Sequence, residues 1–179
     1  RQRQMCIRDR ENTQAREELI VIGRAGIISP NLRAEWERVK SIPEYDQASI
    51  TYQGSSLCLA PEWLEHSLSE SLHRLGVDCI DVVLLTQPEL FLLDARDRNA
   101  RYRDILDQEI EALLIKAFTQ LEQEYHKGRI QYYGVVSSTL GHPGDSIEHL
   151  SPALILRAAQ KAGGENHRCL LYTSPSPRD

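Results

Sequence analysis

The sequence lacks long apolar runs, paired cysteines and any excess of positive charge. Its 179 residues include 4 cysteines, and no two of them form a CxxC pair, which excludes zinc-ribbon and thioredoxin-type redox sites. No stretch approaches the roughly 18 apolar residues that a membrane span requires. The formal net charge of -5 at pH 7 argues against nucleic-acid binding. We therefore expect no nucleic-acid, membrane or metal partner, and isolated thiols suited to a reducing, cytoplasmic compartment.

The rest of the composition is that of an ordinary globular protein. Hydrophobic residues make up 41% of the chain and charged residues 26%, so disorder along the whole length is excluded. The 8 prolines and 10 glycines exclude a collagen-like chain or a proline-rich linker. The length predicts about one domain.

The two ends of the chain differ in character from the rest. The segments MCIRDR and CLLYTS can be back-translated into DNA words that are reverse complements of one another over most of their length. A sequencing adapter joined to both ends of an insert produces such a pair, whereas the alternative is two ordinary frayed termini. We interpret residues 1–10 and 169–179 as adapter-derived tails that are not native, and residues 11–168 as the native fragment. We expect residues 1–10 and 170–179 to pack against nothing and to show no regular structure that buries apolar area.

The segment between these ends alternates predicted strands with predicted helices. Short β-branched apolar runs predict strands, and leucines at helical spacing predict helices. The predicted strands are residues 18–22, 80–85 and 130–136, and the predicted helices are residues 61–75, 105–125 and 147–162. Residues 27–60 are expected to be a long irregular loop, and residues 88–103 a polar connection. This alternation predicts an α/β fold with a parallel sheet, either doubly wound or a (β/α)8 barrel. No GxGxxG follows any predicted strand, which disfavours the doubly wound dinucleotide-binding fold.

Three blocks of the sequence resemble the aldo-keto reductase family. SLSESLHRLGVDCIDVVLL (residues 67–85) resembles the family pattern SLxRLGxDxIDLYLLH, which runs into the fourth barrel strand. EELIVIGRAG (17–26) resembles the third-strand segment, and LEQEYHKGRIQYYGVVSST (121–139) the fifth. LLTQPE (84–89) is similar to a subgroup that reads LLHNPE. The resemblance implies a partial (β/α)8 TIM barrel with parallel strands and about three βα units.

The resemblance also implies an oxidoreductase that uses NADPH to reduce aldehydes or ketones by hydride transfer. In that family a tyrosine protonates the small carbonyl substrate, a lysine oriented by an aspartate lowers the pKa of the tyrosine, and a histidine donates to the carbonyl. Residue by residue, the lysine position is Arg24 and the histidine position is Thr86. The serine–asparagine pair that holds the nicotinamide amide falls at Ser137 and Ser138. The segment that carries the tyrosine and the aspartate has no counterpart in this sequence.

Three of these residues depart from the family pattern. The guanidinium of Arg24 does not give up its proton, the hydroxyl of Thr86 is shorter than an imidazole, and Ser138 lacks the amide of an asparagine. We expect this chain by itself to be inactive, because the general acid and most of the groups that hold the cofactor are absent. The departures at Arg24 and Thr86 favour the alternative, a non-catalytic barrel that binds a nucleotide or a protein partner. Structural interpretations also stay open: Thr86 can cap a strand, Arg24 can form a surface salt bridge, and the two serines lie in a Ser/Gly/Pro-rich loop. His66 and His73 share one helix, which is more typical of solvated histidines than of a metal site.

Overall fold

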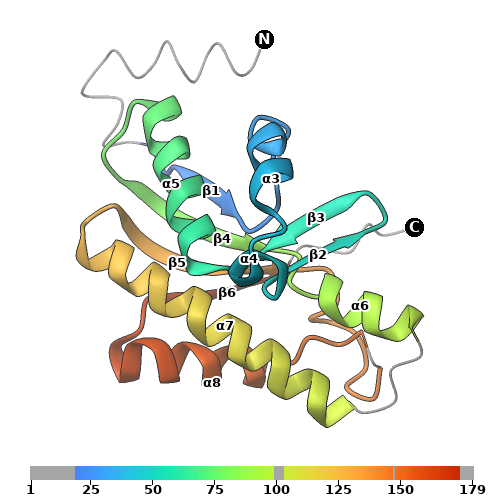
Figure 1. The fold of residues 1–179 in the computed structure, drawn as a ribbon. Coiled ribbons are helices and arrows are strands. Elements are labelled where there is room, and N and C mark those ends of the chain that lie inside the picture. Colours follow the sequence, from blue (N-terminus) through green and yellow to red (C-terminus); the bar gives the residue numbers. More distant parts are fainter. Residues whose placement is uncertain (1–18, 99–102, 147, 174–179) are drawn as a thin grey trace.

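The main unit of the molecule is a four-stranded parallel sheet with helices packed against it (Figure 1). The computed structural model describes residues 19–98, 103–146 and 148–173. The strands follow one another across the sheet as β1 (Ile22–Ala25), β4 (Ile80–Thr86), β5 (Ile130–Ser137) and β6 (Cys169–Thr173). The three long helices between them are α5 (Pro61–Leu75), α7 (Arg103–His126) and α8 (Pro152–Gly163). Short 3-10 helix η2 (Gly164–Asn166) follows α8.

The strand order across the sheet is the same as the strand order along the chain. All neighbouring pairs are parallel, so right-handed crossovers place every connecting helix on the same face. One hydrophobic core confirms this placement, because it joins Val83 and Tyr133 of the sheet to Leu68 of α5, Leu114 of α7 and Ile155 of α8. A doubly wound sheet would reverse its order and cover both faces. The structure therefore confirms the α/β class and the partial barrel, and the sheet does not close within the described residues.

Helix α5 shows how the sequence sets these elements. Pro61 occupies the first turn, where a missing N–H is tolerated, and Gly76 ends the helix in the left-handed region with φ 63°. Leu64, Leu68 and Leu72 recur at helical spacing and are all buried against the sheet. Within the described ranges, every helix is too short or too polar to cross a lipid bilayer.

The face of the sheet opposite the helices is only partly covered. In-register residues of parallel strands point to the same side, and the registers join Ile22 to Val82 and Tyr132, and Leu84 to Gly134 and Leu170. Exposure is 60% for Ile22, 39% for Tyr132 and 43% for Leu170, although all three are large and apolar. We call this surface the open face and define it by its apolar side chains: Ile22, Val82, Leu84, Tyr132, Val136 and Leu170.

The prediction of a long irregular loop at residues 27–60 is wrong. This segment forms α3 (Arg33–Val39), α4 (Pro43–Asp46) and an antiparallel hairpin of β2 (Ser49–Tyr52) and β3 (Ser55–Cys58). Gln53 and Gly54 form its two-residue turn, both with positive φ (46° and 82°), as a hairpin with the usual strand twist requires. Trp36 of α3 packs edge-on against Trp63 of α5, with ring centroids 5.0 Å apart, which anchors the insertion.

Other elements also differ from the prediction. The first strand is Ile22–Ala25 rather than residues 18–22, and α8 begins at Pro152 rather than residue 147. The connection that follows β4 was expected to be polar, and it contains the helix α6 (Leu90–Asp97). Leu90 and Leu92 are buried on that helix, so the apolar residues of its first turn stabilise it against the rest of the protein.

The expectation that residues 170–179 form no regular structure is wrong for β6. Cys169–Thr173 pairs in parallel with β5, with Tyr133 opposite Cys169 and Ser137 opposite Thr173. The segment is apolar enough to join a sheet edge, and Cys169 is buried. Residues 1–10 and 174–179 lie outside the described residues, so the origin of the two tails stays a prediction.

Candidate functional site

The predicted site residues lie near the carboxyl ends of neighbouring strands. Thr86 is the last residue of β4 and pairs with Val136, so it adjoins Ser137 at the end of β5. Arg24 pairs with Leu84, two residues before the end of β4. Parallel strands present their carboxyl ends at one rim, which is where barrel enzymes carry their chemistry. The positions agree with a shared rim, whereas the roles of these residues stay predictions.

A buried carboxylate that the sequence analysis did not single out holds this rim together. Glu89 is 1% exposed, and the backbone N–H and hydroxyl of Ser138 both donate to its Oε1, at 2.9 and 3.0 Å. Its Oε2 is buried without a hydrogen-bond donor among the described residues. A buried acceptor in this state carries a desolvation penalty and can accept one more hydrogen bond.

Local backbone geometry places Glu89 beneath the rim. Gln87, directly after β4, has a positive φ of 59°, and its N–H donates to the carbonyl of Val136 at 2.8 Å. A non-glycine residue in this region is uncommon and marks a constrained turn. The signal in the sequence was the short segment TQPE, in which a proline follows the strand end and a glutamate follows the proline.

The hydroxyls of Ser137 and Thr86 are already engaged within the protein. Ser137 is 1% exposed, its Oγ lies 3.2 Å from Oγ1 of Thr139, and it accepts the backbone N–H of Thr139 at 3.2 Å. Thr86 donates its hydroxyl to the carbonyl of Leu84 at 3.2 Å. Ser138, by contrast, is exposed. A small molecule at the rim would therefore reach Ser138 before it reached the other two hydroxyls.

Arg24 is the exposed cation of this region. Within the described residues its guanidinium makes no hydrogen bond or ion pair, so the alternative interpretation as a surface salt bridge finds no partner there. Its side chain is held only by its place in β1. A catalytic cation is normally fixed by a carboxylate or by packing, and the structure shows neither for Arg24 among the described residues.

A second polar network joins the insertions that follow the strands. Arg96 of α6 pairs with Glu148 in the segment after β5 and donates to the hydroxyl of Tyr52 in the hairpin at 3.3 Å. Tyr52 in turn donates to Asp97 at 2.7 Å. The hydrogen bonds from Tyr52 and Arg96 lower the pKa of Asp97, while the bond to Asp97 raises the pKa of Tyr52. The network therefore links the hairpin after β1, helix α6 after β4 and the segment after β5.

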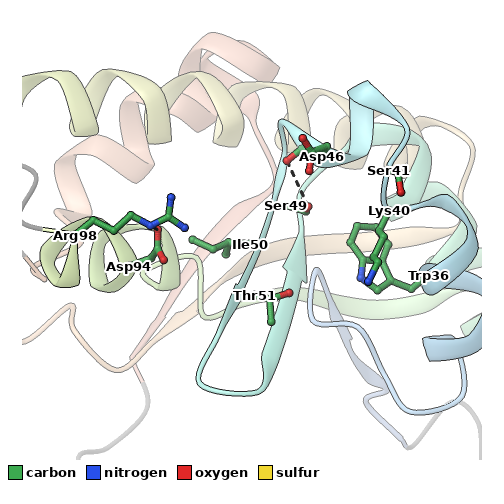
Figure 2. Close-up of a pocket in the computed structure, with 9 residues that line it drawn as sticks. All are labelled: Trp36, Lys40, Ser41, Asp46, Ser49, Ile50, Thr51, Asp94 and Arg98. Carbon is green, nitrogen blue, oxygen red and sulfur yellow. Dashed lines mark hydrogen bonds and ion pairs between the residues drawn. The ribbon is translucent and has the colours of Figure 1, made fainter.

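Two cavities lie among these insertions rather than at the strand ends. The first, about 580 Å³, is bounded by α3, α4, β2 and α6. Figure 2 shows Arg98 and Asp94 on one side of Ile50 and Lys40 beside Trp36 on the other. The second, about 570 Å³, lies between β2, α6 and α7. Neither is lined by a predicted site residue. The first presents charges of both signs, and Arg98 is already paired with Asp94 at 3.0 Å, so its chemistry selects no ligand class.

The two histidines of α5 do not form a site together. Nε2 of His66 lies 3.0 Å from Oε2 of Glu35 on α3, which makes it part of the packing between the two helices. In the part of the chain that the structure describes, no three His, Cys, Asp or Glu side chains gather as a metal site.

Comparison with known proteins gives similarities to solved structures but none to a family model or a curated protein. Among solved structures, the chain is similar to the holo form of aldo-keto reductase AKR11C1 from Bacillus halodurans, with a TM-score of 0.42 and 18% sequence identity. The similarity covers 83% of this chain and 33% of that structure, so the chain spans about a third of its length.

Proposed function

We propose that this chain carries consecutive βα units of an NADPH-dependent aldo-keto reductase barrel, and that its rim belongs to a carbonyl-reducing site. Three sequence blocks in the family order support the proposal. The observation that carries it is the register between β4 and β5: Thr86 pairs with Val136, so the histidine position ends its strand one residue from the amide-binding position, Ser137, at the same rim.

The rim fits the nicotinamide end of the cofactor through one residue. NADPH, when bound, supplies the hydride for such a reaction. The hydroxyl of Ser138 is exposed, and its oxygen keeps lone pairs after donating to Glu89, so it can accept an N–H of the carboxamide. Ser137 does not fit, because its hydroxyl is buried and bonded to Thr139. Glu89 holds Ser138 in place and so orients this contact.

The proton-transfer groups of the family are not reproduced here. Thr86 gives its single proton to the carbonyl of Leu84, and the guanidinium of Arg24 is bulkier than the lysine of the family. The chain is therefore expected to lack turnover. The same observations favour a second candidate function, a non-catalytic barrel that binds a nucleotide or a protein partner through the rim.

The cofactor part of the proposal is tested by NMR titration with reduced nicotinamide mononucleotide. Saturable shifts are expected at the amides of Ser138 and Thr139, and the substitution S138V should weaken binding about tenfold by removing the acceptor. Ser71, which lies on α5 away from the rim, gives the control S71A, which should bind like the unmodified chain. The absence of saturable shifts at the rim would contradict the assignment.

Turnover is tested separately by NADPH oxidation with a panel of aldehydes and ketones. No rate above the uncatalysed reaction is expected, and activity that follows the protein through purification would refute the account of Thr86 and Arg24. The complete reading frame decides between the two candidate functions. A Tyr-Gly pair after an Asp-Thr-Ala-like stretch supports the enzyme, and its absence supports the binding protein.

A further inference from the structure

We propose that Glu89 determines which ligands the rim accepts, because it takes the hydroxyl proton of Ser138 and leaves that exposed hydroxyl as a hydrogen-bond acceptor only. The rim then selects a head group that donates hydrogen bonds, such as a primary carboxamide, and rejects a carboxylate of the same shape. This inference rests on the proposed function, since it concerns the nicotinamide end of the same site.

The hydroxyl proton of Ser138 is already used inside the protein. A serine hydroxyl has one proton to donate and two lone pairs that accept. The Ser138 hydroxyl donates to Oε1 of Glu89 at 3.0 Å, and the backbone N–H of Ser138 donates to the same oxygen at 2.9 Å. Two donors on one oxygen fit the ionised carboxylate, which accepts hydrogen bonds and donates none. Ser138 is exposed, so it offers a ligand its lone pairs and no proton.

The burial of Glu89 keeps this arrangement fixed. Its side chain is 1% exposed, so bulk water does not compete with Ser138 for the carboxylate. Among the described residues no basic side chain pairs with Glu89, and its Oε2 has no hydrogen-bond donor. The negative charge beneath Ser138 is therefore not balanced locally, and charges act more strongly in the interior than in water. An anionic head group on the hydroxyl would meet a lone pair and this charge together.

The other polar groups nearby do not supply the missing donor. Nδ1 of His149 lies 3.3 Å from the carbonyl of Thr139, so the ring bonds to the backbone next to Ser138 rather than to its hydroxyl. Arg24 lies on β1, in register with Gly134 through β4. Ser138 is four residues further along and two strands across, roughly 16 Å away at the usual strand spacing and rise. Arg24 therefore belongs to a different part of the rim.

The departure from the family pattern at this position makes the selection stricter. An asparagine there would offer a ligand both an N–H donor and a carbonyl acceptor. Ser138, when held by Glu89, keeps only the acceptor. A primary carboxamide has two N–H donors, whereas a carboxylate has none. We therefore expect the rim to bind the carboxamide at least about tenfold more tightly than the matching carboxylate.

The proposal is tested by NMR titration of the complete chain with two ligands. These are reduced nicotinamide mononucleotide and reduced nicotinic acid mononucleotide, which differ only in the carboxamide and the carboxylate. The amides of Ser138 and Thr139 report binding, and the unmodified chain should prefer the carboxamide by at least about tenfold. Glu89→Gln removes the charge but keeps an acceptor for Ser138, so the preference should fall to about threefold. Glu89→Leu also frees the hydroxyl proton, so the preference should disappear.

Glu70→Gln is the matched control for the change in charge. Glu70 is exposed on α5, away from the rim, so this variant should keep the full preference. The dispersion of the amide spectrum shows whether each variant is folded, and Glu89→Gln decides the matter where Glu89→Leu does not fold. If neither ligand shifts the rim amides, the proposed function fails and this inference fails with it. Binding of the carboxamide without any preference over the carboxylate overturns the inference alone, as does a full preference in folded Glu89→Gln.

Discussion

Removal of the Tyr133 hydroxyl should destabilise the fold by a predictable amount. Tyr133 is fully buried on the helix side of β5, and its hydroxyl donates to Oε1 of Glu122 on α7 at 2.7 Å. The same oxygen accepts the backbone N–H of Arg168 at 2.9 Å. One glutamate oxygen therefore joins a strand, a helix and the segment that leads into β6.

The magnitude follows from what the substitution Tyr133→Phe leaves behind. The ring contact with Phe118, with centroids 5.1 Å apart, is kept, so little packing is lost. A hydrogen bond to a charged group contributes about 1.5–3 kcal/mol, but the oxygen of Glu122 keeps its bond from Arg168. We therefore expect a loss of about 1–2 kcal/mol in the free energy of unfolding, around the lower limit of that range.

The measurement is urea denaturation followed by far-UV circular dichroism at one protein concentration. With a slope of about 2 kcal/mol per M, the midpoint should fall by about 0.5–1 M. Tyr132→Phe is the matched control, because Tyr132 is the adjacent residue and is 39% exposed. Equal midpoints for the two variants would refute the argument that the buried hydrogen bond carries the difference.

Three further outcomes follow from the buried groups. Burial and the hydrogen bond to Glu122 raise the pKa of Tyr133 above its usual value of 10. The contribution of Tyr133 to the free energy of unfolding is therefore complete below pH 10 and is lost as the pH rises further. The free energy of unfolding measured above pH 10 should fall, and it should fall less in the Tyr133→Phe variant. The substitution Gly134→Ala places a Cβ against a backbone carbonyl of β6 and should lower stability by about 2 kcal/mol or more in the same urea assay, whereas Gly141→Ala, with open space around it, should change it little. Burial raises the pKa of Cys58 to about 12, so iodoacetamide at pH 8 should alkylate half-buried Cys79 while Cys58 stays unmodified by peptide mass spectrometry, and modification of Cys58 in the folded chain would contradict its burial.

The sequence predicted the repeating part of the fold and missed the inserted part. Strands 80–85 and 130–136 were predictable because continuous apolar runs mark a strand covered by helices, and α5 because its ends carry Pro61 and Gly76. Residues 27–60 were not, because their short elements depend on distant partners. Trp36, for example, is buried in a cluster that includes Trp63 on α5 and Cys58 on β3, both distant from it in sequence.

The candidate site was predictable in position but not in its contacts. The end of a strand can be read from a sequence, so Thr86 and Ser137 were placed on neighbouring strand ends. The importance of Glu89 could not be read, because its partner Ser138 is distant in sequence and is reached only through the turn at Gln87. The pairing of Cys169–Thr173 with β5 was not predicted because the segment was interpreted as an adapter-derived tail, although its apolar residues suit the edge of a sheet.

The connections at the two ends of the sheet divide the molecule into a part that tolerates change and a part that does not. Residues 76–79 and 127–129 lead from a helix directly into β4 and β5, and Gly76 and Gly128 both adopt positive φ (63° and 73°) there. The long insertions among the described residues instead follow the carboxyl ends of β1, β4 and β5. Insertions and deletions can therefore accumulate at the rim and alter what it binds, while the register of the sheet is kept by tight turns at the opposite end.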